Sequence, residues 1–235
     1  MTKSVYNYLL LKVDQYNSKM SELRLFSRTN TLDWLQKQTF AIVFYHIRGH
    51  FSELIWLLGN FAPSVEYKQI LLQNIAEEFG GTGISHEQMY LNFVNSFIST
   101  IRIEIAYENL QKLYEDSSAT TFNRCNIAKR FNTKHQDFLK SSSSWASKWA
   151  LFCTYEYLDK VDYDFLLKML KNRLSDVNGV DFTFFEVHAR ADHFHDTRQL
   201  LEKSWFHEPQ EVKKGIDFTL NTQLTMWTQL SESVR

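Results

Sequence analysis

The sequence predicts an all-α protein that folds as one domain. Apolar residues recur every three or four positions along most of the chain, a spacing that places them on one face of a helix. Only 2 Pro and 7 Gly occur in 235 residues, where average usage gives roughly 12 and 16, so a turn-rich β-sandwich is disfavoured. The 44% hydrophobic content is sufficient for one core at this length. We therefore expect a single domain over residues 1–235, built as a bundle of seven to eight helices.

Four helices are predicted in the first half of the chain. Their ranges are 5–20, 32–60, 64–79 and 85–114. The second ends before Pro63, because proline lacks a backbone N–H and its ring clashes with the preceding turn. The third ends at the glycine cluster 80–83, which is the densest in the sequence. Ser85 followed by Gln88 forms a capping-box pattern, which predicts the start of the fourth.

Four further helices are predicted in the second half. Their ranges are 119–139, 145–174, 182–205 and 210–230. The serine run 141–144 separates the first two of these, and Asn178 with Gly179 provides a turn after the second. No stretch of the sequence makes a convincing strand, so we expect helices alone to form the core.

Composition excludes several classes of protein. Lys and Arg together number 26 against 27 Asp and Glu, which leaves no polybasic surface for nucleic acid. The longest apolar stretch, 54–62, contains Gly59 and Asn60, and we expect neither a signal peptide nor a membrane span. The two cysteines, Cys125 and Cys153, give no disulfide framework and no thiolate zinc pattern, which favours a reducing compartment. We therefore expect a cytoplasmic protein without nucleic-acid or membrane partners.

The most informative motif is His188-Ala-Arg-Ala-Asp192-His-Phe-His195. On a helix, positions i, i+4 and i+7 fall within about 60° of one another, so His188, Asp192 and His195 are expected to form one stripe. Neutral imidazole and carboxylate suit iron, manganese or zinc, whereas calcium prefers oxygen ligands. For this motif alone, a solvated polar face is an equally good interpretation.

Three more ligand-type residues lie on otherwise apolar helix faces. Glu156 continues an aromatic stripe of the helix 145–174, and a buried carboxylate is costly unless a partner such as a cation offsets it. Glu78, rather than Glu77, shares the apolar face of its helix, and His86 leads an aromatic face. Each of these alone is more often a paired core residue than a ligand. Together with the histidine motif they supply three carboxylates and three imidazoles, a set that suits two divalent metal ions.

Three segments of the chain resemble the heme-oxygenase-like di-metal oxidases, helical proteins related in fold to heme oxygenase and to the TenA and PqqC enzymes. They are 74–86, which begins Asn-Ile-Ala-Glu-Glu-Phe-Gly and ends in a histidine, 150–156, which ends in a glutamate, and 185–195, which holds the histidine motif. The resemblance implies a heme-oxygenase-like bundle with two Fe(II) ions and dioxygen as co-substrate. The metal ligands that it implies are Glu78, His86, Glu156, His188, Asp192 and His195. Glu53 and His46 are left open as an additional ligand.

The resemblance also implies a class of substrate. It points to a non-heme di-iron oxygenase or oxidase of natural-product biosynthesis that oxidises an amino acid or a related small carboxylate. A tryptophan-type amino acid, undergoing oxidative carbon–carbon cleavage or nitrile formation, would suit aromatic pocket walls. The aromatic residues that could lie on the pocket side are Phe40, Phe44, Tyr45, Phe93, Phe97, Trp149, Phe152, Tyr155 and Phe184. Packing in the core is the more common role of such rings, because 15% of the residues are aromatic. The candidate anchors for a substrate carboxylate are Arg102, Arg124, Lys148 and Arg190.

Other functions stay open on the sequence alone. A TenA-like hydrolase would use Cys153 as its nucleophile, and an oxygenase that consumes its own tyrosine is compatible with the 11 Tyr. A non-catalytic interaction protein would use the polar stripes to bind a partner helix and would hold no metal. Heme binding through His46 is a weaker alternative, because the carboxylates would have no role beside a porphyrin. Bundles of this kind often pair as homodimers.

Overall fold

The structure is a computed structural model of the 235-residue chain, and it describes residues 4–81, 83–98 and 119–234. Within these ranges the secondary structure is helical, with turns between the helices and no strand, so the predicted all-α class is confirmed. The helices are α1 (Val5–Glu22), α2 (Arg24–Ser27), α3 (Trp34–Gly49), α4 (Phe51–Phe61), α5 (Val65–Glu78), α6 (His86–Ile98), α8 (Ala119–Lys140), α9 (Trp145–Arg173), α10 (Thr183–Arg190), α11 (Phe194–His207) and α12 (Pro209–Ser233).

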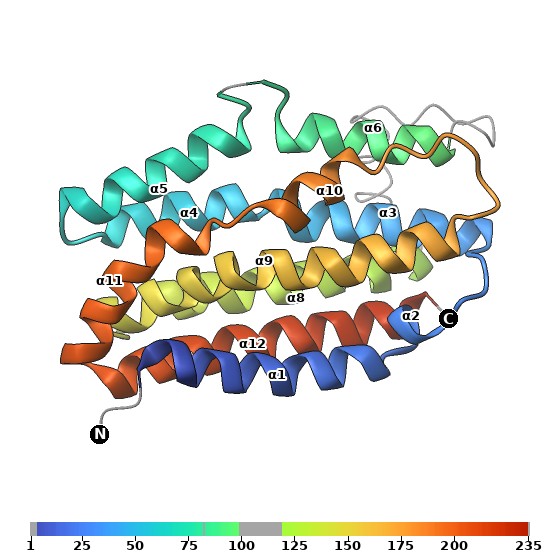
Figure 1. Ribbon diagram of the computed structural model, residues 1–235. Helices are drawn as coiled ribbons and strands as arrows, with labels where there is room; N and C mark the ends of the chain where they lie inside the picture. The colour runs from blue at the N-terminus through green and yellow to red at the C-terminus, as the bar shows by residue number, and fades with distance from the viewer. Residues whose placement is uncertain (1–3, 82, 99–118, 235) are drawn as a thin grey trace.

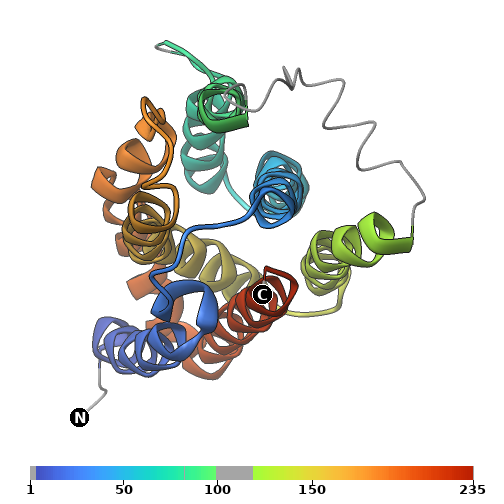
Figure 2. The same ribbon diagram turned by 90° about the vertical axis from the view of Figure 1, so that its right-hand side faces the viewer.

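The bundle is organised around α9, which lies in its middle (Figure 1). Every residue from 146 to 156 is buried, which is typical of a helix surrounded by others on all sides. α9 packs against α12, α10 and α11, while α1 runs beside α12. Figure 2 shows the helices in cross-section, with α3 and α4 between α5 and α6 on one side and α8 on the other.

The turn between α5 and α6 brings two candidate ligands to facing helix ends. α5 ends at Glu78, and Gly80 follows with a φ of 78°, a left-handed conformation that glycine adopts without strain. The Oγ of Ser85 accepts the N–H of Gln88 at 3.2 Å and caps the start of α6 at His86. The predicted end of one helix and start of the next are therefore confirmed.

Two predicted helices are each divided in the structure. The range 32–60 divides at His50 into α3 and α4, and the range 182–205 divides at 191–193 into α10 and α11. Ala191 is extended, with φ −65° and ψ 145°, and so ends α10. Apolar residues continue at helical spacing on both sides of each break, so periodicity alone could not locate the breaks. Residues 99–114 of the fourth predicted helix lie outside the described residues.

A buried carboxylate joins three helices of the core. Asp162 of α9 accepts a hydrogen bond from the Tyr16 hydroxyl of α1 at 2.8 Å and another from Nε1 of Trp227 in α12 at 3.0 Å. Burial raises the pKa of Asp162 to about 7, although these two hydrogen bonds oppose the shift.

The stability of the fold is therefore expected to depend on the protonation of Asp162. Because its pKa is higher in the folded chain than the ordinary value of 3.8, protonation stabilises the fold fully below about pH 4, and this contribution is lost as the pH rises through about 7. The complete loss is on the order of 4 kcal/mol. We expect Asp162→Asn to remove it, because the amide stays neutral while its oxygen still accepts from Trp227. Urea unfolding of both proteins across this pH range measures the effect, and parallel stability profiles would contradict the expectation.

Candidate metal centre

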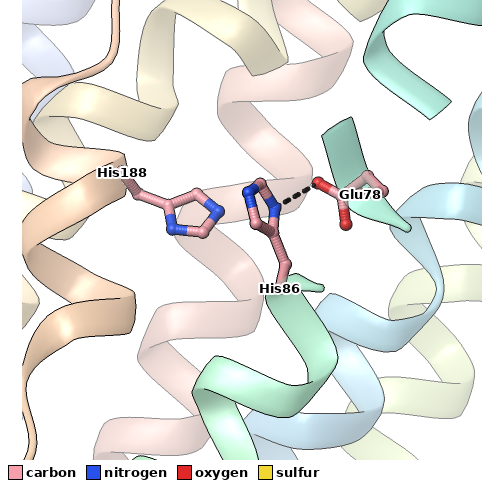
Figure 3. A group of neighbouring side chains, drawn as sticks. All are labelled: Glu78, His86 and His188. Carbon is pink, nitrogen blue, oxygen red and sulfur yellow. Dashed lines mark hydrogen bonds and ion pairs between the residues drawn. The ribbon is translucent and has the colours of Figure 1, made fainter. Parts of the chain in front are cut away.

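Three ligand-type side chains from separate helices meet at one point (Figure 3). Glu78 is the last residue of α5, His86 is the first of α6, and His188 lies in α10. One potential ligand atom of each lies within 4.8 Å of those of the other two. Oε1 of Glu78 is 3.0 Å from Nδ1 of His86, and the ring centroids of His86 and His188 are 4.4 Å apart. Ligand atoms of one ion lie about 3 to 4 Å apart, so small side-chain rotations would suffice to bind one.

His188 is held in the form in which a histidine binds metal. Its Nδ1 lies 2.7 Å from the carbonyl oxygen of Phe184, so Nδ1 carries the proton and donates it. Nε2 is buried and has no hydrogen-bond partner. Burial holds the pKa of His188 well below its usual range, and the positive charge of Arg48 lowers it further. The ring is therefore neutral, with an unused lone pair, which is the usual arrangement of a metal-binding histidine.

Glu156 presents a second unused ligand atom. It is buried in α9, and its Oε1 has no hydrogen-bond partner. Burial raises the pKa of Glu156 well above its usual range, and the negative charges of Asp159 and Glu78 raise it further. A buried carboxylate without a partner is costly, and a bound cation would reverse this cost. The donor atoms present therefore fit a divalent metal ion.

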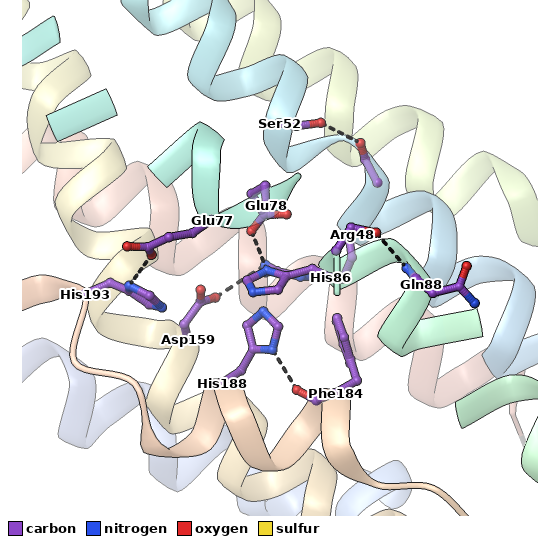
Figure 4. Close-up of polar contacts among 12 residues, drawn as sticks. Arg48, Ser52, Glu77, Glu78, His86, Gln88, Asp159, Phe184, His188 and His193 are labelled. Atoms are coloured by element: carbon purple, nitrogen blue, oxygen red, sulfur yellow. Dashed lines mark hydrogen bonds and ion pairs between the residues drawn. The ribbon is translucent and has the colours of Figure 1, made fainter. Parts of the chain in front are cut away.

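One narrow cavity collects these groups. It is lined by Glu78, His86, Glu156 and His188, and also by three ligand-type residues that the sequence interpretation did not select, Glu77, Asp159 and His193. Figure 4 shows His193 beside Glu77, with Nδ1 3.4 Å from the Oε2 of that glutamate. The Glu77 side chain is 39% exposed against 17% for Glu78, so Glu78 is the more buried of the pair.

Asp192 and His195 are not brought to this cavity. Both are exposed, because α10 ends at Arg190 and the extended Ala191 redirects the chain before α11 begins. The expected stripe of His188, Asp192 and His195 needs one continuous helix, and in the structure this stripe is not formed. His193 faces the cavity in their place. Nothing in the sequence pattern favours His193, whereas Asp159 could have been found, because it lies three residues after Glu156 on the same helix face.

The two further ligands left open by the sequence also lie elsewhere. Glu53 has a side chain that is 69% exposed, and it pairs with Nδ1 of His50 at 2.8 Å. Neither Glu53 nor His46 is among the described residues that line the cavity. Among the described residues, His46 therefore does not lie with the metal cluster, and the structure gives no support for a heme ligand at that position.

A second, open pocket adjoins the cluster. Glu78 and His86 form part of its wall, and Tyr45, Arg48 and Phe184 form another part. Tyr45 and Phe184 are the expected pocket aromatics that lie here; the others of that set are not among its lining residues. A small molecule in this pocket would therefore lie against Glu78 and His86 of the cluster.

The alternative nucleophile Cys153 and two of the expected anchors, Lys148 and Arg190, are not among the described residues that line this pocket. Cys153 is fully buried, its Sγ lies 3.9 Å from the carbonyl oxygen of Thr197, and burial raises the pKa of its thiol well above the usual range. A thiol so placed is a poor nucleophile. Lys148 lies over the Phe61 ring at 4.3 Å, and Arg190 is exposed. The anchors Arg102 and Arg124 and the second cysteine, Cys125, lie outside the described side chains.

The sequence matches no protein-family model, and it matches no curated protein. Solved structures that are similar to this one include two that cover nearly the whole chain. One is a domain of unknown function with a heme oxygenase-like fold from Shewanella denitrificans, with a TM-score of 0.72 and 15% identity over 100% of this chain and 93% of that one. The other is a CADD-like protein of unknown function from Nostoc punctiforme, with a TM-score of 0.66 and 13% identity over 97% of this chain and 98% of that one.

These similarities confirm the heme-oxygenase-like fold that the three sequence segments implied. At 13 to 15% identity they concern the fold and not the chemistry. Among the described residues, no helix combines the length and the apolar character needed to span a bilayer. The function has therefore to be argued from the cluster and its pocket.

Proposed function

From the heme-oxygenase-like fold and the cluster of Glu78, His86 and His188, we propose that the protein is a non-heme di-iron oxygenase or oxidase that oxidises an amino acid or a related small carboxylate. The proposal depends above all on two buried ligand atoms that have no hydrogen-bond partner, Oε1 of Glu156 and Nε2 of His188. Both residues line the cavity that Glu78 and His86 also line. Imidazole and carboxylate groups are the usual protein ligands of non-heme iron. Iron bound here would activate dioxygen.

Different side chains would bind the two metal ions. Glu78, His86 and His188 would hold one ion, and the carbonyl oxygen of Phe184 would keep His188 in the correct tautomer. Glu156 lies on the same cavity and would supply a further carboxylate for metal binding. The second ion has two candidate ligand pairs. Asp159 and His193 line the cavity as it stands, whereas Asp192 and His195 are the pair that the sequence resemblance implies.

The open pocket would bind the substrate. Tyr90 and Phe184 form an aromatic part of its wall. Tyr45 is held in place because its hydroxyl donates a hydrogen bond to Oε1 of Glu87 at 2.7 Å. An aromatic side chain bound here would bury apolar area next to Glu78 and His86. A tryptophan-type amino acid, oxidised by carbon–carbon cleavage or to a nitrile, is therefore our preferred substrate class.

Loading with ferrous iron without oxygen tests the proposal. We expect about two irons per chain in the unaltered protein, followed by oxygen uptake when air-saturated buffer is added.

Two double variants distinguish the candidate ligand pairs of the second ion. If the cavity holds both ions in its present form, Asp159→Asn with His193→Ala is expected to bind about one iron per chain, whereas Asp192→Asn with His195→Ala is expected to bind both. The reverse pattern would show that α10 extends through His195 on loading and brings the implied pair to the cavity. An unaltered protein that binds no iron and consumes no oxygen would overturn the proposal and favour a non-catalytic interaction protein.

A further inference from the structure

Arg48, in the last turn of α3, lines the open pocket and pairs with Asp159, which lines the candidate metal cavity. Its side chain is only 13% exposed, and Nη1 lies 3.3 Å from Oδ1 of Asp159. The centre of the guanidinium is 5.1 Å from the Phe51 ring and 5.2 Å from the Tyr163 ring. Nε is buried and has no hydrogen-bond partner. Two aromatic rings and one carboxylate thus hold the guanidinium of Arg48 in place. Its Nε–H group remains free to donate a hydrogen bond.

The charge balance of Arg48 depends on the neighbouring cavity. Its ion-pair partner Asp159 also lines that cavity, together with Glu78 and Glu156. A divalent cation bound there would compete for these carboxylates. Arg48 would then hold a buried positive charge with weaker compensation, which is costly. A negative group that enters from the pocket would restore the balance.

The pocket supplies the entry for such a group. Arg48 is part of its wall, together with Glu78 and His86 of the cluster. Among the described residues that line the pocket, it is the one Lys or Arg. The acidic Glu87 of the same wall is already engaged by the Tyr45 hydroxyl. Among the described residues that line this pocket, Arg48 is therefore the permanently charged cation that an anion could bind.

We propose that Arg48 is the substrate anchor, and that its fork binds the carboxylate of the small molecule that occupies the pocket. A guanidinium matches a carboxylate with two parallel N–H···O bonds, which a lysine cannot provide. Bound in this way, the rest of the molecule would lie along Tyr90 and Phe184 and beside Glu78 and His86. The assignment rests on the proposed function for its substrate class and adds the residue that recognises the acid group.

Calorimetric binding of phenylacetate and of its neutral analogue phenylacetamide tests the assignment. Zinc serves as the metal because it takes part in no redox chemistry, and each protein is measured both zinc-loaded and metal-free. In the unaltered protein we expect the acid to bind roughly 10- to 100-fold more tightly than the amide. Arg48→Gln is expected to lose this preference and to keep its zinc content. Arg198→Gln, which removes the same charge from an exposed pair with Glu202, is expected to change neither.

Each alternative outcome has a defined meaning. An acid preference of the same size in Arg48→Gln would overturn the assignment and indicate that the carboxylate binds the metal or another group. If Arg48→Gln does not fold, Arg48→Lys decides, because it keeps the charge but not the fork: its preference is expected to fall, and an unchanged preference would overturn the assignment. Failure to bind zinc would count against the metal centre, whereas the comparison in metal-free protein would still test Arg48.

Discussion

His188→Ala is expected to lower the affinity for ferrous iron by on the order of 100-fold or more, with the helical fold retained. The Nε2 atom of His188 is buried without a partner, and the ring is held in the neutral tautomer by its hydrogen bond to Phe184. Alanine removes this lone pair and leaves Glu78 and His86 as the remaining members of the cluster. Anaerobic equilibrium dialysis with ferrous iron measures the loss, and circular dichroism monitors the fold.

His135→Ala is a matched control for this variant. Both histidines are 1% exposed, and Nδ1 of His135 likewise lies 2.8 Å from the carbonyl oxygen four residues earlier, that of Phe131. The difference is at Nε2, which in His135 lies 3.3 Å from Oγ1 of Thr222. We expect His135→Ala to reduce stability and to leave iron binding unchanged. An equal loss of iron in both variants would mean that general destabilisation, and not a lost ligand, is responsible.

Gly215→Ala is expected to destabilise the fold by on the order of 3 kcal/mol. A Cβ atom at this position in α12 would clash with the carbonyl oxygen of Ser147 and would lie 2.9 Å from Cβ of Ala150 and 3.0 Å from the backbone nitrogen of Leu151. Two of these three atoms belong to the backbone of α9, which cannot rotate away as a side chain can. The two helices would have to separate along their interface. Urea unfolding measures the change in free energy.

Gly59→Ala provides the comparison for this substitution. Gly59 also lies in a helix, α4, but a Cβ atom there would meet nothing within 4 Å. Alanine has the higher helix propensity by about 1 kcal/mol, so this variant is expected to be neutral or slightly more stable. A similar loss of stability in both variants would contradict the packing argument for Gly215.

Much of the architecture could be predicted because helical periodicity and helix ends are local properties. The spacing of apolar residues predicts α1, α5, α9 and α12 close to their observed bounds. Pro63, the glycine cluster 80–83 and Ser85 mark ends that the structure keeps. The divisions at His50 and at 191–193 were not predicted, because a helix can end inside a periodic stretch when its two halves pack against different neighbours.

Part of the candidate site could be predicted for the same reason. Periodicity determines the face of a helix on which a residue lies, and it placed Glu78, His86 and Glu156 on apolar faces. The structure has these three on one cavity with His188, which the histidine motif had indicated. The assignment of Asp192 and His195 depended in addition on an unbroken helix beyond Arg190. That continuity is a property of the packed chain, and the extended Ala191 interrupts it.

The sequence by itself determined the helical class, the single bundle and the position of Glu78, His86 and Glu156 on apolar helix faces, because each follows from the order of apolar and polar residues along a few turns. Only the tertiary structure decided that Arg48 meets Asp159, 111 positions away in the chain, and that His193 faces the cavity while Asp192 and His195 do not. Such contacts depend on how α3, α9 and α10 pack against one another. No local pattern specifies that packing, because each contact forms between segments that are distant in sequence.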